Sequence, residues 1–326
     1  MIAMTRWFVA MVVSWIAGAV SAASIVTTVT ARQVQPWNGL VEITVGLSCE
    51  SNDLVVVFCT FAATNSATRA ALPVLHVRHV GRDTGSEREW QRHFIWDAAA
   101  DLGEAKIDDV ALTVDAQGPV QLWENGPYWA PCNVGATKPE EYGYCFWWGD
   151  TVGYKRNSAD YGWVSVEDGS SFSFSSRNCP TYLNDNSMLQ VLGYIDTAGN
   201  LATSYDAATA HLGVPWRMPT DAEFSALISN CTTTWTMRNG VYGRLVTGKG
   251  VYASKSIFLP AAGYGKGDDF CYLRGLDGYY WSSTPNSGRT GDAWCLYVNS
   301  VNFCQDSYFV ERYCGRSVRP LREFAQ

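Results

Sequence analysis

Apolar and polar residues alternate through the first third of the chain, in short runs separated by turn-forming residues. Strict alternation is the pattern of half-buried β-strands, and turn signals such as WNG, ESND and GRDTGS fall between the runs, where antiparallel hairpins need them. Since no helical pattern interrupts them, the runs predict an all-β, immunoglobulin-like sandwich over residues 23–117, which we interpret as a stalk or spacer. The six runs cover residues 25–34, 40–49, 54–64, 74–81, 88–96 and 107–116.

The pattern changes at Gly118 and Pro119, which interrupt the last predicted strand; tryptophan, tyrosine and glycine then become frequent. We expect a second domain over residues 118–326, an α+β domain with long ordered loops. Its one clear helical pattern begins after Thr220, which can cap the helix while Glu223 completes a T-x-x-E capping box. The core-facing stripe of this helix consists of Phe224, Leu227 and Ile228.

Residues 294–320 do not follow one strand pattern. Trp294, Leu296 and Val298 alternate as a half-buried strand should, but cysteines and large aromatic residues fall between them and after them. Exposed aromatic and thiol side chains are unusual on a surface that has no binding function. The segment therefore indicates either a binding surface or additional core positions.

The N-terminus has the three parts of a secretory signal peptide: a positive charge in MIAMTR, an apolar run over residues 7–20 and small residues in VSAAS. We expect residues 1–22 to be removed and the protein to be exported to the cell surface or the extracellular space, with the periplasm as the alternative. The apolar run is short for a membrane-spanning helix, and no later stretch of about eighteen apolar residues follows it. No membrane span is expected.

Composition and charge narrow the class of partner. Hydrophobic residues make up 47% and charged residues 17% of the chain, an ordinary balance for a folded protein with a substantial core. The formal net charge of -7 argues against a nucleic-acid-binding protein, because such proteins need a basic surface to replace condensed counterions. Four arginines near the C-terminus are spaced as on a solvated strand edge: Arg312, Arg316, Arg319 and Arg322.

Ten cysteines in an exported chain can form disulfides, but the sequence does not reveal their connectivity. No pair has the CxxC or Cys/His spacing of a zinc site. Three pairings are candidates: Cys49 with Cys59, Cys132 with Cys145, and Cys179 with Cys231.

Five sequence blocks follow one another in the second domain: WENGPYWAPCNVGATKPEEYGYCFWWGD, WRMPTDAEFSAL, IFLPAAGYG, GYYWSSTPN and GRSVRPLRE. Over residues 121–323 their order and spacing resemble the Fibrobacter succinogenes major paralogous domain of secreted bacterial proteins. The resemblance implies a C-type lectin-like fold, in which the PTDAEF helix packs beside a small twisted sheet and the closing SVRPL strand pairs near the first strand of the domain. Because this fold hosts sugar binders, protein binders and a few enzymes, function must be argued from the site.

Two functions of that fold lack their usual residues in this chain. Calcium-dependent lectins carry a carboxylate at positions that here read TPN (284–286) and AWC (293–295). Formylglycine-generating enzymes have a similar fold, but their cysteine motif is not present, and neither is a GxSxG, HExxH or P-loop motif. We therefore expect no cofactor and no catalytic activity, and we keep these two functions as alternatives. The loop aspartates that remain as donors for calcium are Asp268, Asp269, Asp277 and Asp292.

The resemblance also extends to proteins whose C-terminal coding segment is rewritten by diversity-generating retroelements. These elements change adenines, so a rewritten Asn codon never encodes Trp, Lys, Met, Glu or Gln, and Gln305 and Glu311 would then belong to the fixed frame. On this basis we predict a variable loop surface that binds a protein or glycan on another cell, a phage or a host. The alternative is that some of these residues belong to the core. The predicted ligand-binding residues are Leu276, Asp277, Tyr279, Arg289, Asp292, Cys295, Tyr297, Phe303, Asp306, Tyr308, Phe309 and Tyr313.

Overall fold

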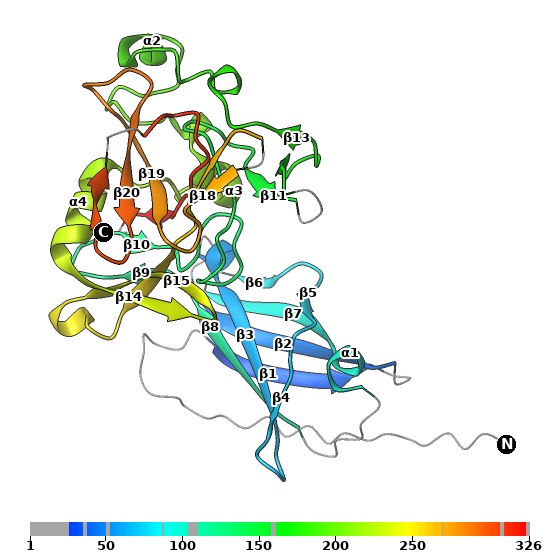
Figure 1. Cartoon of the computed structure of the whole chain (residues 1–326). Coiled ribbons are helices and arrows are strands. Elements are labelled where there is room, and N and C mark those ends of the chain that lie inside the picture. The colour runs from blue at the N-terminus through cyan, green and yellow to red at the C-terminus, as the bar shows by residue number, and fades with distance from the viewer. Residues whose placement is uncertain are drawn as a thin grey trace. The chain divides into compact units, whose positions relative to one another are not determined.

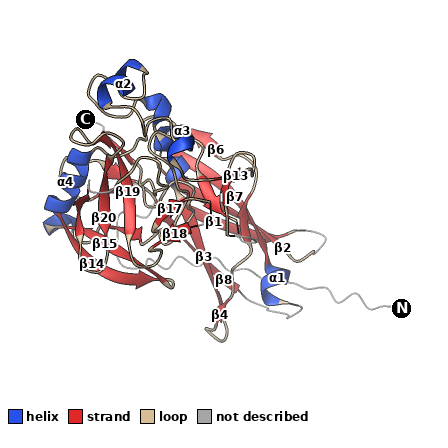
Figure 2. Ribbon diagram, turned by 45° about the horizontal axis from the view of Figure 1, so that its top comes forward, coloured by secondary structure: helices blue, strands red, loops and turns tan. Residues whose placement is uncertain are grey.

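The structure is a computed structural model that describes residues 26–34, 38–49, 53–86, 88–103, 110–157, 161–268, 270–306 and 310–323. The chain forms two compact units that meet in the sequence between Gly118 and Pro119 (Figure 1). The paired strands of both units are antiparallel and mostly short, and helices are few (Figure 2). The predicted signal peptide lies outside the described residues. None of the helices in the described part of the chain is long and apolar enough to cross a membrane.

The N-terminal unit contains two sheets. The first has the order β1 (Val26–Gln33), β2 (Leu40–Ser48), β7 (Glu89–Asp97) and β5 (Val77–His79), and β6 (Thr84–Ser86) also pairs with β7. The second has the order β4 (Ala71–Leu72), β3 (Phe58–Asn65) and β8 (Val110–Gln117). The remaining elements are a 3-10 turn at Leu54–Val56 and the short helix α1 (Ala98–Leu102).

Both sheets of the N-terminal unit contribute to one hydrophobic core. Val41 and Ile43 alternate with partly exposed residues along β2, and they share the core with Ala63 of β3 and Leu112 of β8. Each of the six predicted runs overlaps a strand, so the predicted strands are confirmed, and the predicted alternation is clear in β1 and β2. Strands β4 and β6 have only two and three residues, too few for an alternation to be visible.

The C-terminal unit contains several small antiparallel sheets. Their strands are β9 (Val120–Gln121), β10 (Tyr128–Trp129) and β22 (Leu321–Arg322); β11 (Tyr154–Arg156), β12 (Trp163–Ser165) and β13 (Ser171–Phe172); β14 (Cys231–Arg238), β15 (Val241–Gly248) and β16 (Ser256–Pro260); β17 (Tyr264–Lys266) and β18 (Phe270–Tyr272); β19 (Gly278–Pro285), β20 (Ala293–Val298) and β21 (Phe303–Asp306). Its helices are α2 (Asn186–Val191), α3 (Ala207–Leu212) and α4 (Asp221–Asn230), with 3-10 turns at Ser176–Asn178, Thr203–Tyr205 and Gly250–Tyr252.

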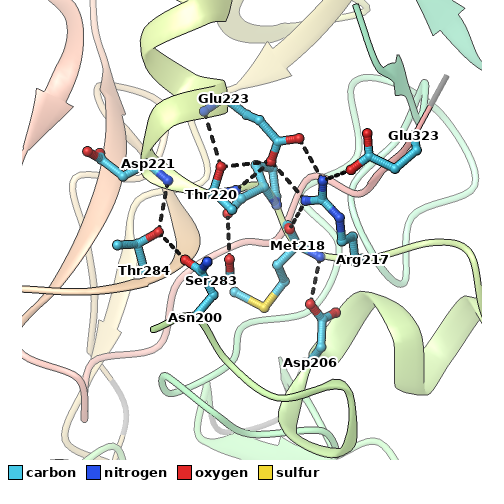
Figure 3. A network of polar contacts seen from close by, with 11 residues as sticks. Asn200, Asp206, Arg217, Met218, Thr220, Asp221, Glu223, Ser283, Thr284 and Glu323 are labelled. Atoms are coloured by element: carbon cyan, nitrogen blue, oxygen red, sulfur yellow. Dashed lines mark hydrogen bonds and ion pairs between the residues drawn. The ribbon is translucent and has the colours of Figure 1, made fainter. Parts of the chain in front are cut away.

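Helix α4 begins with the predicted capping box (Figure 3). The Thr220 hydroxyl accepts a hydrogen bond from the Glu223 amide at 3.2 Å, and the Glu223 carboxylate accepts one from the Thr220 amide at 2.8 Å. Arg217 donates to both carboxylate oxygens of Glu223, at 2.8 and 2.7 Å. The predicted apolar stripe is confirmed, because Phe224 and Leu227 are buried and Ile228 packs against the same core.

The start of α4 is also tied to strand β19 (Figure 3). The Asp221 amide donates to the Thr284 hydroxyl at 3.1 Å, and that hydroxyl donates to the side-chain oxygen of Asn200 at 2.6 Å. The Ser283 amide donates to the Pro219 carbonyl at 2.7 Å. The PTDAEF and WSSTPN segments are therefore joined by hydrogen bonds, which fix the start of α4 against β19.

The end of the chain returns to the start of the C-terminal unit. Strand β22 pairs with β10, which pairs with β9. The predicted pairing of the SVRPL segment near the first strand of this domain is confirmed.

The four C-terminal arginines are buried, so the prediction of a solvated strand edge is wrong. Arg319 shows why: its guanidinium donates to the Asn133 side-chain oxygen at 2.9 Å, to the Ala130 carbonyl at 3.0 Å and to the Phe258 carbonyl at 2.7 Å. A guanidinium has five N–H donors in a rigid plane, so it can join three segments inside the protein. The exposed fractions are 0% for Arg312, 2% for Arg316, 0% for Arg319 and 7% for Arg322.

Four cysteines of the candidate pairings are buried thiols, and these two pairings are not formed in the structure. Burial raises the pKa of Cys132 and Cys145 to about 12 and that of Cys179 and Cys231 to about 11. Cys49 and Cys59 both pack against the N-terminal core, and their pairing stays a prediction.

Candidate ligand-binding surface

The hairpin formed by β17 and β18 has an open face rich in aromatic side chains. Its register places Tyr264 opposite Tyr272 and Lys266 opposite Phe270. Because side chains two residues apart share a face of a strand, all four point to the same side of the hairpin. Phe270 is 58% exposed and Tyr272 is 39% exposed.

The other face of this hairpin is fixed against the interior. Cys271 packs against a core cluster that contains Trp163 and Phe174. A Cβ atom at Gly265 would lie 2.7 Å from ring atoms of both Phe174 and Trp163, so the backbone approaches these rings as closely as only glycine allows. The exposed aromatic side chains therefore stand on a backbone that is packed from behind.

Five aromatic rings continue from the hairpin onto strands β19 and β20. Ring centroids are 5.4 Å apart for Phe270 and Tyr272, and 5.2 Å apart for Tyr272 and Tyr264. They are 5.3 Å apart for Tyr264 and Tyr279, and 5.0 Å apart for Tyr279 and Tyr297. Each such pair contributes about 0.5–1.5 kcal/mol beyond its buried area, which favours a preformed surface. We call these five residues the aromatic platform.

A carboxylate lies at one end of the aromatic platform. One oxygen of Asp277 accepts hydrogen bonds from the Tyr279 hydroxyl at 3.3 Å and the Tyr297 hydroxyl at 3.2 Å. The side-chain amide of Asn299 donates to the Tyr297 hydroxyl at 2.6 Å. Burial, and then the charge of Asp277, raise the pKa values of both tyrosines above their usual range, so both hydroxyls stay protonated at neutral pH.

A buried arginine lies against the inner side of the aromatic platform. The guanidinium carbon of Arg316 is 5.2 Å from the ring centre of Tyr264, 4.7 Å from that of Tyr279 and 4.8 Å from that of Trp281. Such contacts stabilise a cation over aromatic faces. Its Nε and Nη1 atoms are enclosed and have no hydrogen-bond partner among the described residues. The guanidinium is thus packed among three aromatic rings.

A second cation, Lys266, lies on the open face. Its Nζ atom is 3.5 Å from a carboxylate oxygen of Glu311 and 5.2 Å from the ring centre of Tyr313. A hydrogen bond with Tyr313, together with nearby negative groups, raises the pKa of Lys266, so the side chain is charged at neutral pH. The side chain remains 39% exposed, which leaves it accessible to a ligand.

Comparisons with protein-family models, with curated proteins and with solved structures give no match to this chain. The site is therefore argued from its own geometry.

Four of the predicted ligand-binding residues lie in or beside the aromatic platform. Tyr279 and Tyr297 belong to it, and Asp277 joins their hydroxyls. Tyr313 contacts Lys266 of the same hairpin. A fifth predicted residue, Leu276, is 63% exposed in the connection between β18 and β19.

Cys295 is not a surface residue, so its assignment to the ligand surface is corrected. It is fully buried in β20, where it shares a core cluster with Trp281. Leu296 and Val298 are buried in a different cluster, because β20 has a hydrophobic core against each of its faces. This double burial explains the mixed pattern of the segment. Phe303 is partly buried against the second cluster.

Asp292 is also buried, with 5% of its surface exposed, so its predicted place on the ligand-binding surface is corrected. Its carbonyl accepts hydrogen bonds from the Asn286 amide and the Arg312 guanidinium, which hold this turn inside the unit. Arg289 is exposed, and its Nε atom lies 3.3 Å from a carboxylate oxygen of Asp292 without the geometry of a hydrogen bond. Burial raises the pKa of Asp292.

Tyr308 and Phe309 lie outside the described residues, as does the side chain of Asp306. Among the described residues, no group of three or more His, Cys, Asp or Glu side chains is placed to hold a metal ion. Asp269, one of the aspartates considered for calcium, also lies outside them.

The part of the surface formed by the β17–β18 hairpin and by Arg316 was not predicted from the sequence. A signal for the hairpin is present: residues 264–272 read YGKGDDFCY, in which a Gly-Asp turn separates two short segments with alternating aromatic residues. The position of Arg316 has no local signal, because the three rings that enclose it come from two separate strands.

Proposed function

We propose that this chain is an exported ligand-binding protein in which a C-type lectin-like domain follows an immunoglobulin-like spacer and binds a protein or glycan through the aromatic platform. The observation that carries the proposal is the continuous series of five rings, of which Phe270 and Tyr272 are 58% and 39% exposed on a hairpin that is packed from behind. The proposed activity is binding, without catalysis.

Exposed aromatic residues on a rigid base are suited to binding. Tyr and Phe offer a large contact area for few rotatable bonds, so little conformational entropy is lost when a ligand is bound. Leu273 and Leu276 follow Tyr272 closely in the chain and are also exposed, with 41% and 63% of their surface accessible. Exposed aromatic and apolar side chains are typical of an interaction site.

Burial restricts which positions a retroelement can diversify in this proposal. Cys295 and Cys314 are fully buried, and a core position does not accept the range of side chains that rewriting produces. Exposed positions accept this range of side chains. Those among the predicted variable positions include Leu276, Arg289 and Cys304. A reverse transcriptase gene beside an adenine-rich near-copy of codons 270–320 would support this part of the proposal, and variation would then be expected at the exposed codons.

The proposed function is tested by removing the exposed apolar side chains together. We expect the triple variant Phe270→Ser, Tyr272→Ser and Leu276→Ser to change the melting temperature by no more than about 5 °C, because exposed substitutions cost little. Capture of ligands on glycan and protein arrays should be lost.

A matched control removes three exposed apolar side chains elsewhere in the same unit. Met237, Tyr242 and Val251 have 49%, 44% and 90% of their surface exposed and lie outside the platform. The variant with serine at all three positions should retain capture. If the platform variant is folded and captures the same ligands as the unaltered protein, the proposed function is wrong.

A further inference from the structure

The platform combines aromatic rings with two cations, one on its open face and one beneath it. Lys266 shares the open face of the hairpin with Tyr264, Phe270 and Tyr272, and Arg316 lies under Tyr264. Among the described residues, the Nε and Nη1 atoms of the buried Arg316 find no acceptor, so its positive charge favours an anionic group nearby. Of the two cations, Lys266 is the one that a ligand can contact directly.

At the end of the platform formed by Tyr279 and Tyr297, polar side chains lie beside the rings. Asp277 accepts hydrogen bonds from both tyrosine hydroxyls, and Asn299 donates to one of them. A carboxylate and an amide can exchange hydrogen bonds with hydroxyl groups of a ligand, which both donate and accept. The site thus offers an apolar surface, a reachable cation and a polar group suited to hydroxyls.

On the basis of the proposed function, we propose that the aromatic platform binds a pyranose sugar that carries one carboxylate, such as a sialic acid or a uronic acid at the end of a glycan. The apolar C–H face of the ring lies on Tyr264 and Tyr272, the carboxylate pairs with Lys266, and hydroxyls reach Asp277. Arg316 adds positive charge beneath Tyr264, one of the two rings that the sugar covers.

The acidic groups around the platform exclude a strongly anionic partner. Asp277 and Glu311 lie beside the rings and the reachable cation, and the whole chain has a formal net charge of -7. An acidic peptide or a polysulfated chain would bring many charges against these carboxylates, whereas a single carboxylate brings one charge, which Lys266 can share with Glu311. A sugar with one carboxylate can pair with the positive charge of Lys266 and adds little repulsion from the nearby carboxylates.

The experiment compares matched probes on the full chain. Titrations use the methyl α-glycoside of N-acetylneuraminic acid against its carboxamide, and methyl β-glucuronide against methyl β-glucoside. The two members of each pair differ only in the acidic group. We expect the acidic member of at least one pair to bind about tenfold or more tightly than its neutral partner. The two pairs distinguish a sialic acid from a uronic acid.

Substitutions at Lys266 then test whether this side chain binds the carboxylate of the sugar. Lys266→Met should lower the affinity for the acidic sugar by about tenfold, and Lys266→Arg should keep it within about threefold. The side chain is partly exposed, so both variants are expected to fold. Lys255→Met is the matched control, since Lys255 lies 5.4 Å from the ring of Tyr252 in the same unit but outside the platform. It should bind as the unaltered protein does.

Equal binding of the acidic and neutral partners in both pairs, or unchanged binding by folded Lys266→Met, overturns the inference. The triple variant at Phe270, Tyr272 and Leu276 can also lose the capture of a ligand that carries no acidic sugar, such as a protein. That result would overturn the inference of an acidic sugar and leave the proposed function intact. If the triple variant loses no ligand at all, the proposed function fails with it.

Discussion

Buried arginines act as polar cross-links in the C-terminal unit. Arg312 donates to the carbonyl oxygens of Asp292, Thr181 and Asn184, and Arg319 donates to three other segments. Burial lowers the pKa of Arg312 to about 10, so the guanidinium is still charged at neutral pH. Carbonyl dipoles satisfy the hydrogen bonds of these charges inside the protein, where an unpaired ion would be costly.

Replacing one of these arginines should therefore destabilise the fold. Arg319→Met leaves three buried acceptors without donors, and each costs about 1–3 kcal/mol, so we expect the free energy of unfolding to fall by about 3 kcal/mol or more. Urea denaturation measures this change. Arg177→Met, at an exposed arginine of the same unit, should change it by less than about 0.5 kcal/mol. A similar small change at Arg319 would contradict the cross-link.

Two cysteines on paired strands should differ in how far they tolerate substitution by a larger side chain. Cys295 is fully buried in β20, whereas Cys304 is exposed in the neighbouring β21. Because overpacking a core costs about 1–3 kcal/mol or more, Cys295→Tyr should lower the free energy of unfolding by at least that amount. Cys304→Tyr should change it by less than about 0.5 kcal/mol. Equal tolerance at both sites in urea denaturation would show that burial does not limit diversification.

Helix α4 depends on the carboxylate of Glu223 at its first turn. This carboxylate accepts from the Thr220 amide and hydroxyl and from Arg217 (Figure 3). Burial alone would raise its pKa, but the hydrogen bonds and charge of Arg217 and the capping contacts outweigh burial and lower it below 4.5. The charged form is thus favoured by folding.

A pH dependence follows from this lowered pKa. As pH falls through 4.5, the unfolded chain binds a proton at Glu223 before the folded chain does, so this contribution to stability is present above that pH and is lost toward lower pH. Glu223→Gln should lower the free energy of unfolding at pH 7 by about 1 kcal/mol and should reduce its loss on acidification. Urea denaturation at pH 7 and at about pH 3 tests this. Parallel pH profiles for both proteins would contradict it.

The two compact units have separate hydrophobic cores. The N-terminal core is made by residues between Val26 and Leu112, and the three C-terminal clusters by residues between Leu122 and Leu321. No cluster of the described residues includes both units. Each unit therefore buries its own apolar surface, which is the requirement for independent folding.

We expect polypeptides covering residues 23–118 and 119–326 to fold separately. Each should unfold in a single cooperative transition, followed by circular dichroism in urea. The longer one should also keep the ligand capture proposed for the platform. A non-cooperative transition of either polypeptide would show that its core is incomplete without the other unit.

The amino-acid sequence by itself determined the features that depend on neighbours along the chain. The alternation of the N-terminal strands and the capping box at Thr220 and Glu223 are local, because a strand repeats every two residues and a helix cap involves positions three apart. The change in composition at Gly118 lies where the two units meet. These patterns do not depend on which other segments pack nearby.

Only the tertiary structure decided the burial of Cys295 and of the arginines, and the assembly of the aromatic platform. A strand with a core against both faces, such as β20, hides its cysteine although its neighbours alternate. The rings that enclose Arg316 come from β17 and β19, and the platform adds Tyr297 from β20. Burial and ring contacts of this kind are set by segments distant in the chain, so no local pattern encodes them.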